Sequence, residues 1–133
     1  MYNHFKFNRE FRNMIILYGF ALIFWLSLVF YREFNNTDIV LLRKNIMSIC
    51  NGWCFGHFIH YMLLGYFAPS YWKYIIIIGI VFELIEILLN KASKYIDSKL
   101  IEDSITNTLG LFTGLILHNF FPNKIDILQI MKN

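Results

Sequence analysis

The chain has 133 residues, of which 57% are hydrophobic, 19% are aromatic and 16% are charged, and its net charge is +3. A soluble domain of this length could not bury so much apolar surface, so the composition indicates a single integral membrane domain, residues 1–133. The small positive charge argues against nucleic acid as a partner, and the hydrophobicity favours membrane lipids.

Four apolar segments follow one another along the chain, at about residues 14–31, 46–68, 74–89 and 103–121. The first has no charged residue and is about long enough to cross ~30 Å of hydrocarbon at ~1.5 Å per helical residue. A turn at Pro69 and Ser70 separates the second segment from the third, and Pro122 ends the fourth. Residues 90–102 are polar, and we expect them to form a short amphipathic segment at the membrane interface.

The fold class follows from the need of backbone N–H and C=O groups for hydrogen-bond partners inside a lipid bilayer. Only α-helices and closed barrels satisfy every backbone polar group there, and the sequence has no alternating strand pattern. We therefore predict an all-α fold: a multi-pass bundle of about four transmembrane helices, with the interfacial segment before the last.

Basic residues do not decide the orientation of such a bundle. With four spans, six basic residues fall on each side of the membrane, so the positive-inside rule has no bias to act on. One side holds Lys6, Arg9, Arg12, Lys73, Lys124 and Lys132, and the other holds Arg32, Arg43, Lys44, Lys91, Lys94 and Lys99. The basic flank before the first span favours a cytoplasmic N-terminus.

Polar side chains interrupt the last three apolar segments in pairs. Each pair is three or four residues apart, which places both members on one face of a helix: His57 and His60, Glu83 and Glu86, and Asp103 and Asn107. An ionised acid at the centre of a bilayer costs about 2.5–3.5 kcal/mol, so the two glutamates should face inward, towards the histidines, a cation or protons. We therefore expect the three pairs to meet in a common site.

Each of these residues also has a purely structural interpretation. The glutamates could lie at a water-facing helix end, and the histidines could be hydrogen-bonded packing groups. Asp103 could cap its helix, and Asn107 could tie two helices together. Gly110 and Gly114, which continue the same face, are most simply explained by close helix contact.

Cys50 and Cys54 are four residues apart. If this stretch is helical, the two side chains share a face, but the geometry of a regular helix does not suit a disulfide between them. We expect two free thiols that fill space in the core.

Two motifs resemble known membrane families. "EDSITNTLGLFTG" (102–114) resembles the D-x-x-x-N-x-x-G-x-x-x-G signature of VanZ-like proteins, and "FELIE" (82–86) resembles their E-x-x-Q/E element. The stretch "GHFIHYMLLGYFAPSYWKYIIIIGIVFELIE" (56–86) is similar to the core of base-exchange phosphatidylserine synthases, in which a G-H-F precedes an F-E-x-x-E by similar spacing. Together the resemblances cover roughly residues 50–120.

The resemblance to the synthases implies a calcium-dependent exchange of a phospholipid head-group alcohol for serine. His57 matches the essential histidine of that family, Glu83, Glu86 and Asp103 match the acids around its metal, and Asn107 matches a later asparagine. The chain departs from the synthases in three ways. Asp103 and Asn107 are four residues apart, as in VanZ-like proteins, and the chain is much shorter than a synthase. The synthase segment between the acids is replaced by "NKASKYIDSKLIED" (90–103), in which Asp97 and Glu102 are the acids that could take its place.

The donor types agree with this implication. Three carboxylates, from Glu83, Glu86 and Asp103, plus an amide oxygen suit a hard cation such as Ca²⁺ better than zinc. A histidine beside a phosphodiester can act as general base or as nucleophile, so His57, His60 and Asn107 are the candidate catalytic residues. Two alternatives stay open: a non-enzymatic accessory or lipid-ligand-binding protein, and an ion path, for which so short a chain would need to form a homo-oligomer.

Overall fold

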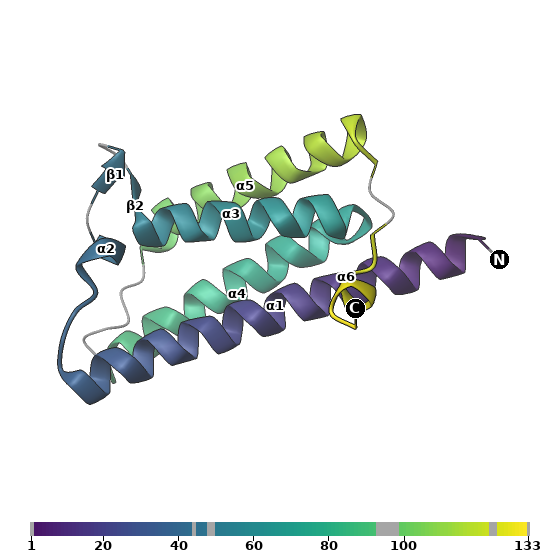
Figure 1. The fold of residues 1–133 in the computed structure, drawn as a ribbon. Helices are drawn as coiled ribbons and strands as arrows, with labels where there is room; N and C mark the ends of the chain where they lie inside the picture. The colour runs from purple at the N-terminus through teal and green to yellow at the C-terminus, as the bar shows by residue number, and fades with distance from the viewer. Residues whose placement is uncertain (1, 44, 48–49, 93–98, 123–124, 133) are drawn as a thin grey trace.

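The computed structural model describes residues 2–43, 45–47, 50–92, 99–122 and 125–132. Four long helices make up most of the chain (Figure 1): α1 (Tyr2–Asn35), α3 (Gly52–Phe67), α4 (Trp72–Asn90) and α5 (Leu100–Phe120). The shorter elements are α2 (Val40–Arg43), the 3₁₀ turn η1 (Pro69–Tyr71), α6 (Ile127–Ile130) and a hairpin of β1 (Asn45–Met47) and β2 (Cys50–Asn51). The prediction of an all-α fold is confirmed.

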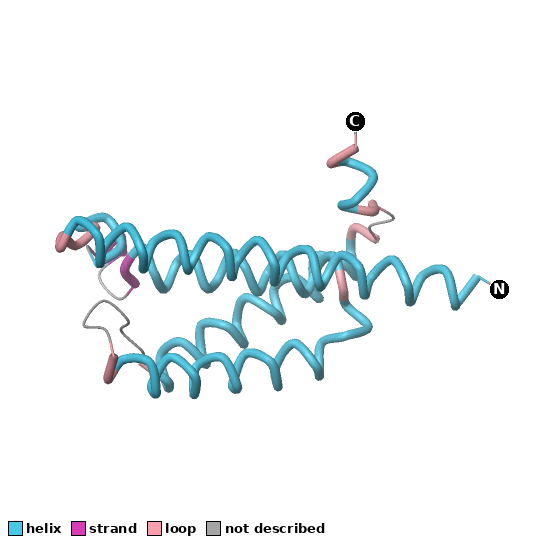
Figure 2. The backbone as a smooth tube through the Cα atoms, turned by 90° about the horizontal axis from the view of Figure 1, so that it is seen from below, coloured by secondary structure: helices cyan, strands magenta, loops and turns pink. Residues whose placement is uncertain are grey.

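The long helices run up and down the molecule in turn. α1 and α4 run in one direction and α3 and α5 in the other, as the colour gradient of Figure 1 and the tube in Figure 2 show. One end of the bundle holds the end of α1, the β1–β2 hairpin, the starts of α3 and α5, and the end of α4. We call it the hairpin end. The other end holds both chain termini and η1, and we call it the terminal end.

Glycines allow α3 and α5 to lie very close together. A methyl group added at Gly110 would overlap the backbone oxygen of Phe58, and one at Gly114 would overlap that of Met62. From the other side, a methyl group at Gly65 would overlap the backbone oxygen of Leu111. The interpretation of Gly110 and Gly114 as a helix-contact patch is therefore confirmed, and Gly65 completes it on α3.

The second apolar segment differs from its predicted course. We expected a helix over residues 46–68, but α3 begins at Gly52 and has 16 residues, about 24 Å at ~1.5 Å per residue. The preceding residues form the hairpin, in which Asn45 pairs with Asn51 and Met47 with Cys50. Asn51 sets the start of the helix, because its side chain accepts a hydrogen bond of 2.9 Å from the Cys54 N–H and so caps the first turn.

The same difference overturns the expectation for the cysteines. Cys50 and Cys54 form a disulfide, with 5.5 Å between their Cα atoms. The expectation of two free thiols was wrong because it placed both residues on one regular helix. Cys50 instead lies on β2, and only Cys54 lies on α3, so the chain turn between them brings the two sulfurs together.

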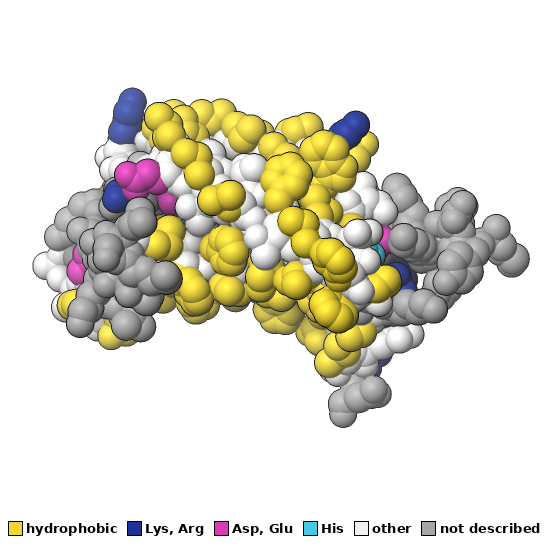
Figure 3. Space-filling model, turned by 90° about the horizontal axis from the view of Figure 1, so that it is seen from above, with side chains coloured by type: hydrophobic (Ala, Val, Ile, Leu, Met, Phe, Trp, Pro, Cys, Tyr) yellow, Lys and Arg dark blue, Asp and Glu magenta, His cyan; other side chains and the backbone are white. Residues whose placement is uncertain are grey.

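Large apolar side chains are spread over the face of the bundle drawn in Figure 3, and the charged side chains on this face lie towards its two ends. Phe30, Leu88 and Phe120 are examples of large side chains that are mostly exposed. Among the described helices, one stretch, Arg9–Asn35 of α1, is both long and apolar enough to cross a bilayer by itself. Of the expected interfacial segment at residues 90–102, the part at 93–98, which includes Asp97, lies outside the described residues.

The interior contrasts with this surface. Leu64, Ile75 and Leu111 are fully buried, but so are the polar side chains of Glu10, Glu83 and others. In water-soluble proteins, charged side chains are almost never fully buried unless they are paired. The exposed surface therefore resembles that of a protein whose surroundings are apolar.

Candidate functional site

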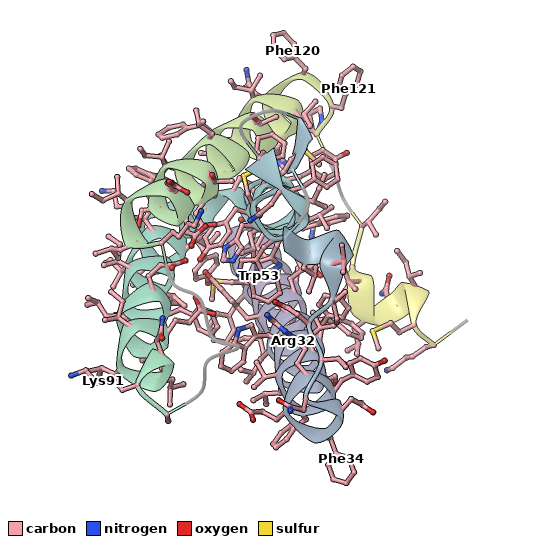
Figure 4. All side chains as sticks on the ribbon, turned by 90° about the vertical axis from the view of Figure 1, so that its left-hand side faces the viewer. Arg32, Phe34, Trp53, Lys91, Phe120 and Phe121 are labelled. Atoms are coloured by element: carbon pink, nitrogen blue, oxygen red, sulfur yellow. A yellow bond between two sulfur atoms is a disulfide. The ribbon has the colours of Figure 1, made fainter. Side chains whose placement is uncertain are left out.

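The acids and amide expected in the site lie inside the hairpin-end half of the bundle. Glu83 and Glu86 on α4 are each 1% exposed, and Asp103 and Asn107 on α5 are 4% and 6% exposed. His57 reaches them from α3, one turn beyond the hairpin. Figure 4 looks along the helices from this end: Lys91 and Phe34 point outward there, whereas Trp53 and Arg32 lie among the helices.

A chain of two hydrogen bonds connects three helices. The Asn107 amide donates from Nδ2 to Glu83 Oε1 at 3.2 Å, and its Oδ1 lies 3.0 Å from His57 Nδ1. Because a carbonyl oxygen only accepts, His57 must carry its proton on Nδ1 and donate it to Asn107. In the neutral ring Nε2 then keeps its lone pair, which makes it the atom of His57 that can accept a proton.

The carboxylates of Glu83 and Asp103 lie close enough to affect each other and His57. His57 Nδ1 is 3.8 Å from Glu83 Oε1, within ion-pair distance if the ring is protonated. Asp103 interacts electrostatically with both Glu83 and His57. An electropositive group entering here would relieve the repulsion between Glu83 and Asp103.

Asp103 also has the capping role that the sequence suggested. Its Oδ2 accepts a hydrogen bond of 3.1 Å from the backbone N–H of Lys99, the residue before α5 begins. Glu102 beside it is exposed and pairs with Lys99 at 3.2 Å, so it faces away from the site. The cap fixes where the Asp103 carboxylate lies.

Residues in the first turn of α3 also hold the His57 ring in place. Trp53 meets the ring edge to face, with 5.8 Å between centroids. Cys54, one turn before His57, is joined to the hairpin by the disulfide and has Thr106 of α5 3.7 Å from its sulfur. The position of His57 is thus set by a cap, a covalent link and a ring contact.

His60 lies apart from this hydrogen-bond chain. Its ring packs edge to face on Tyr18 and Tyr61, at 5.5 Å and 5.4 Å between centroids. These contacts give it the environment of a packing residue, although it was expected to share the site with His57.

Tyr61 is a site residue that the sequence analysis missed. Its hydroxyl lies against Gly79, one turn before Glu83 on α4, where a methyl group would collide with it. Tyr61 also interacts electrostatically with Glu83 and Glu86. A small cavity of about 60 Å³ adjoins it, lined in part by Asn107, Ser104 and Thr108. The signal that could have found Tyr61 is the glycine four residues before Glu83, which leaves room for a large partner.

Arg32 was also missed, because it directly follows the first apolar segment, residues 14–31, and was counted only among the basic residues on one side of the membrane. It lies in the last turn of α1, is 5% exposed, and pairs with Asp38 at 2.6 Å. Figure 4, which views the molecule from the hairpin end, shows Arg32 near the middle of the bundle. Its burial at the hairpin end places a guanidinium, the group best suited to phosphate, at this end of the bundle.

The acids do not form a ready-made metal centre. Among the residues that the structure describes, no three His, Cys, Asp or Glu side chains are already grouped as metal ligands. The donor chemistry of Glu83, Glu86 and Asp103 nevertheless fits a hard cation, since all three offer carboxylate oxygens. Binding by all three would require side-chain rotation within the bundle.

The terminal end has a polar cluster with a different character. Glu10 accepts a hydrogen bond of 3.0 Å from the Ser70 N–H, and Arg12 pairs with Asp126. The Asn13 amide donates to the Ile125 carbonyl at 3.1 Å and accepts from the Ile127 N–H at 3.0 Å. These contacts fasten η1 and the C-terminal segment to α1, so we interpret the cluster as structural.

Comparison with known proteins found no similar protein. No family model, no curated protein and no solved structure matches the chain. The candidate site therefore rests on its own geometry and chemistry.

Proposed function

We propose that this chain is a multi-pass membrane protein that transfers the polar head groups of phospholipids at a site formed by His57, Asn107, Glu83, Glu86 and Asp103. The observation that carries the proposal is the hydrogen-bond chain from His57 through Asn107 to Glu83, buried inside helices whose outer surface is apolar. Buried ionisable groups in such surroundings are costly, and they usually mark a functional site.

The membrane part of the proposal rests on the distribution of side chains. α1 has a span of sufficient length, and α4 and α5 have 19 and 21 residues, enough for about 28 and 32 Å at ~1.5 Å per residue. Exposed apolar side chains continue over α4 and α5, for example at Ile77, Leu84 and Ile116. α3 is shorter, and the hairpin before it would lie at the membrane surface.

In the proposed reaction His57 is the general base. An incoming alcohol loses its proton to His57 Nε2 as its oxygen forms a bond to phosphorus. The bond from phosphorus to the departing head-group oxygen breaks, and that oxygen takes the proton from His57. Asn107 and Glu83 hold the ring in the required tautomer and stabilise its protonated form, as an acceptor behind a catalytic histidine does in other enzymes.

A hard divalent cation, when bound, would neutralise charge on the phosphate. Glu83, Glu86 and Asp103 are the residues that would hold it, and calcium is the cation that their chemistry favours. The Arg32 guanidinium at the same end is a further group that could attract a phosphate.

The sequence resemblance supports the same reaction class. The motifs at residues 82–86 and 102–114 are similar to those of VanZ-like proteins, and residues 56–86 are similar to the core of phosphatidylserine synthases. The residues that match the synthase site include the three in the hydrogen-bond chain.

A second candidate function is non-enzymatic. The Asn107 amide uses both its donor and its acceptor within the protein, and the described acids are not grouped as metal ligands. Such a self-contained network could hold a lipid-binding or accessory bundle together.

The two candidate functions predict different results in a head-group exchange assay. Purified protein is reconstituted in phospholipid vesicles with Ca²⁺ and a mixture of labelled serine, ethanolamine and glycerol, and label is measured in the lipid fraction. We expect exchange by the wild type and a loss of about 100-fold or more in His57→Ala. His118→Ala is the matched control, because His118 bonds the Tyr66 carbonyl at 2.7 Å, away from the site. Equal exchange by His57→Ala and wild type would rule out the catalytic role.

A further inference from the structure

We propose that the hairpin end of the bundle faces the oxidising, extracytoplasmic side of its membrane, so that the site takes its lipid and its alcohol from the outer leaflet and the space beyond it. This inference rests on the proposed membrane function and specifies the source of its substrates. Its evidence is the position of the Cys50–Cys54 disulfide relative to the site.

The disulfide indicates which end of the bundle faces out of the cell, which the equal numbers of basic residues at the two ends do not decide. The sequence has two cysteines, and both are in this bond. Disulfides persist in oxidising compartments and are rare where cytosolic reductants reach them. Both partners lie at the hairpin end, Cys50 on β2 and Cys54 in the first turn of α3. The end that carries them is therefore the one expected outside.

The site lies nearer to the same end of the bundle than to the terminal end. His57 is three residues after Cys54 on α3, and Asp103 lies in the first turn of α5. Glu86 is one turn from the end of α4. Each of these residues is within about two turns of the hairpin end of its helix, so a head group would reach them from the leaflet on that side.

The N-terminal flank agrees with this orientation. If the hairpin end is outside, the terminal end is in the cytoplasm, with Arg9 and Arg12 in the first turn of the Arg9–Asn35 stretch of α1. Basic residues before a first span favour that placement. The disulfide and the flanking charges are independent observations, and they give the same answer.

Cysteine reporters at the two ends test the orientation directly. Thr37→Cys and Ser70→Cys are matched positions: both are exposed, uncharged and in short connections, one at the hairpin end and one at the terminal end. Each is made in a Cys50→Ser/Cys54→Ser background and treated in spheroplasts with a membrane-impermeant maleimide. We expect at least tenfold faster labelling of Thr37→Cys, and labelling of Ser70→Cys only after permeabilisation. The reverse pattern would overturn the inference.

Wild-type protein provides a second test that does not need the double substitution. Spheroplasts are treated with a membrane-impermeant reductant, free thiols are blocked with a permeant reagent, and the mass of the purified chain is measured. We expect both thiols to be blocked after reductant and neither without it. Thiols blocked without reductant would overturn the inference. Neither readout depends on exchange activity, so a failure of the orientation is distinguishable from a failure of the proposed function.

Discussion

Asn107 donates a hydrogen bond of 3.2 Å to Glu83, and this bond joins α5 to α4 at a point where both side chains are shut off from the surroundings. The same amide accepts from His57 on α3. One residue thus fixes the relative position of three helices and the proton position on the histidine. Structure and proposed chemistry depend on the same bond, so substitutions here should affect both.

Asn107→Leu should destabilise the bundle. The leucine has as many side-chain heavy atoms as asparagine, but it removes the donor to Glu83 Oε1 and the acceptor for His57 Nδ1, and the loss of hydrogen bonds to buried polar groups costs about 1–3 kcal/mol. The free energy of unfolding, measured in detergent by denaturant titration, should fall by that amount. Asn90→Leu is the control, because Asn90 is exposed at the end of α4. An Asn107→Leu protein as stable as the control would show that the amide hydrogen bonds do not stabilise the bundle.

Gly114→Ala should destabilise the protein by about 1–3 kcal/mol through overpacking, because its methyl group would overlap the Met62 backbone oxygen and push α3 away from α5. Gly56→Ala is the matched control: an added methyl group there meets nothing within 4 Å. Since alanine favours a helix over glycine by about 1 kcal/mol, Gly56→Ala should be neutral or stabilising. Thermal unfolding in detergent measures both, and similar midpoints for the two variants would contradict the close contact.

Asn13→Ala should release the C-terminal segment from α1. The change removes both the donor to the Ile125 carbonyl and the acceptor for the Ile127 N–H. Hydrogen exchange at the Ile127 amide should become at least tenfold faster, while amides in α5 keep their protection. Asn35→Ala is the control, because Asn35 is exposed and donates within its own helix, at 2.8 Å to the Tyr31 carbonyl. Unchanged exchange at Ile127 would mean that other contacts hold the segment.

The helices could be predicted because long apolar runs with polar ends have few alternatives. The gathering of Glu83, Asp103, Asn107 and His57 at one end was also predictable, because helical spacing puts each pair on one face and burial cost directs that face inward. The hydrogen-bond partner of each side chain could not be predicted. Hydrogen bonds between helices depend on how far each helix is shifted along its axis relative to the next, and the local sequence does not determine that shift. His60 is the example: its spacing matches that of His57, but the tyrosines beside it determine its surroundings.

The hairpin was the main structural feature that periodicity could not reveal. Residues 46–51 are as apolar as the helix that follows them, so the apolar run conceals the helix start at Gly52. Asn51 is a good helix cap, and giving it that role would have moved the boundary and separated the two cysteines onto different elements. Buried Arg32 was unpredictable for another reason: an arginine at the end of an apolar span normally extends to the interface.

The most direct test of the account is whether the buried acids serve a bound cation or only the packing of helices. Thermal unfolding of the purified wild type is measured with and without Ca²⁺, beside Glu83→Gln and the control Glu102→Gln, whose side chain is 72% exposed. At a concentration 100 times its dissociation constant, Ca²⁺ should add about 2.7 kcal/mol of stability to the wild type and to Glu102→Gln, and little to Glu83→Gln. The same response in all three proteins, or none in the wild type, would contradict the proposed cation site.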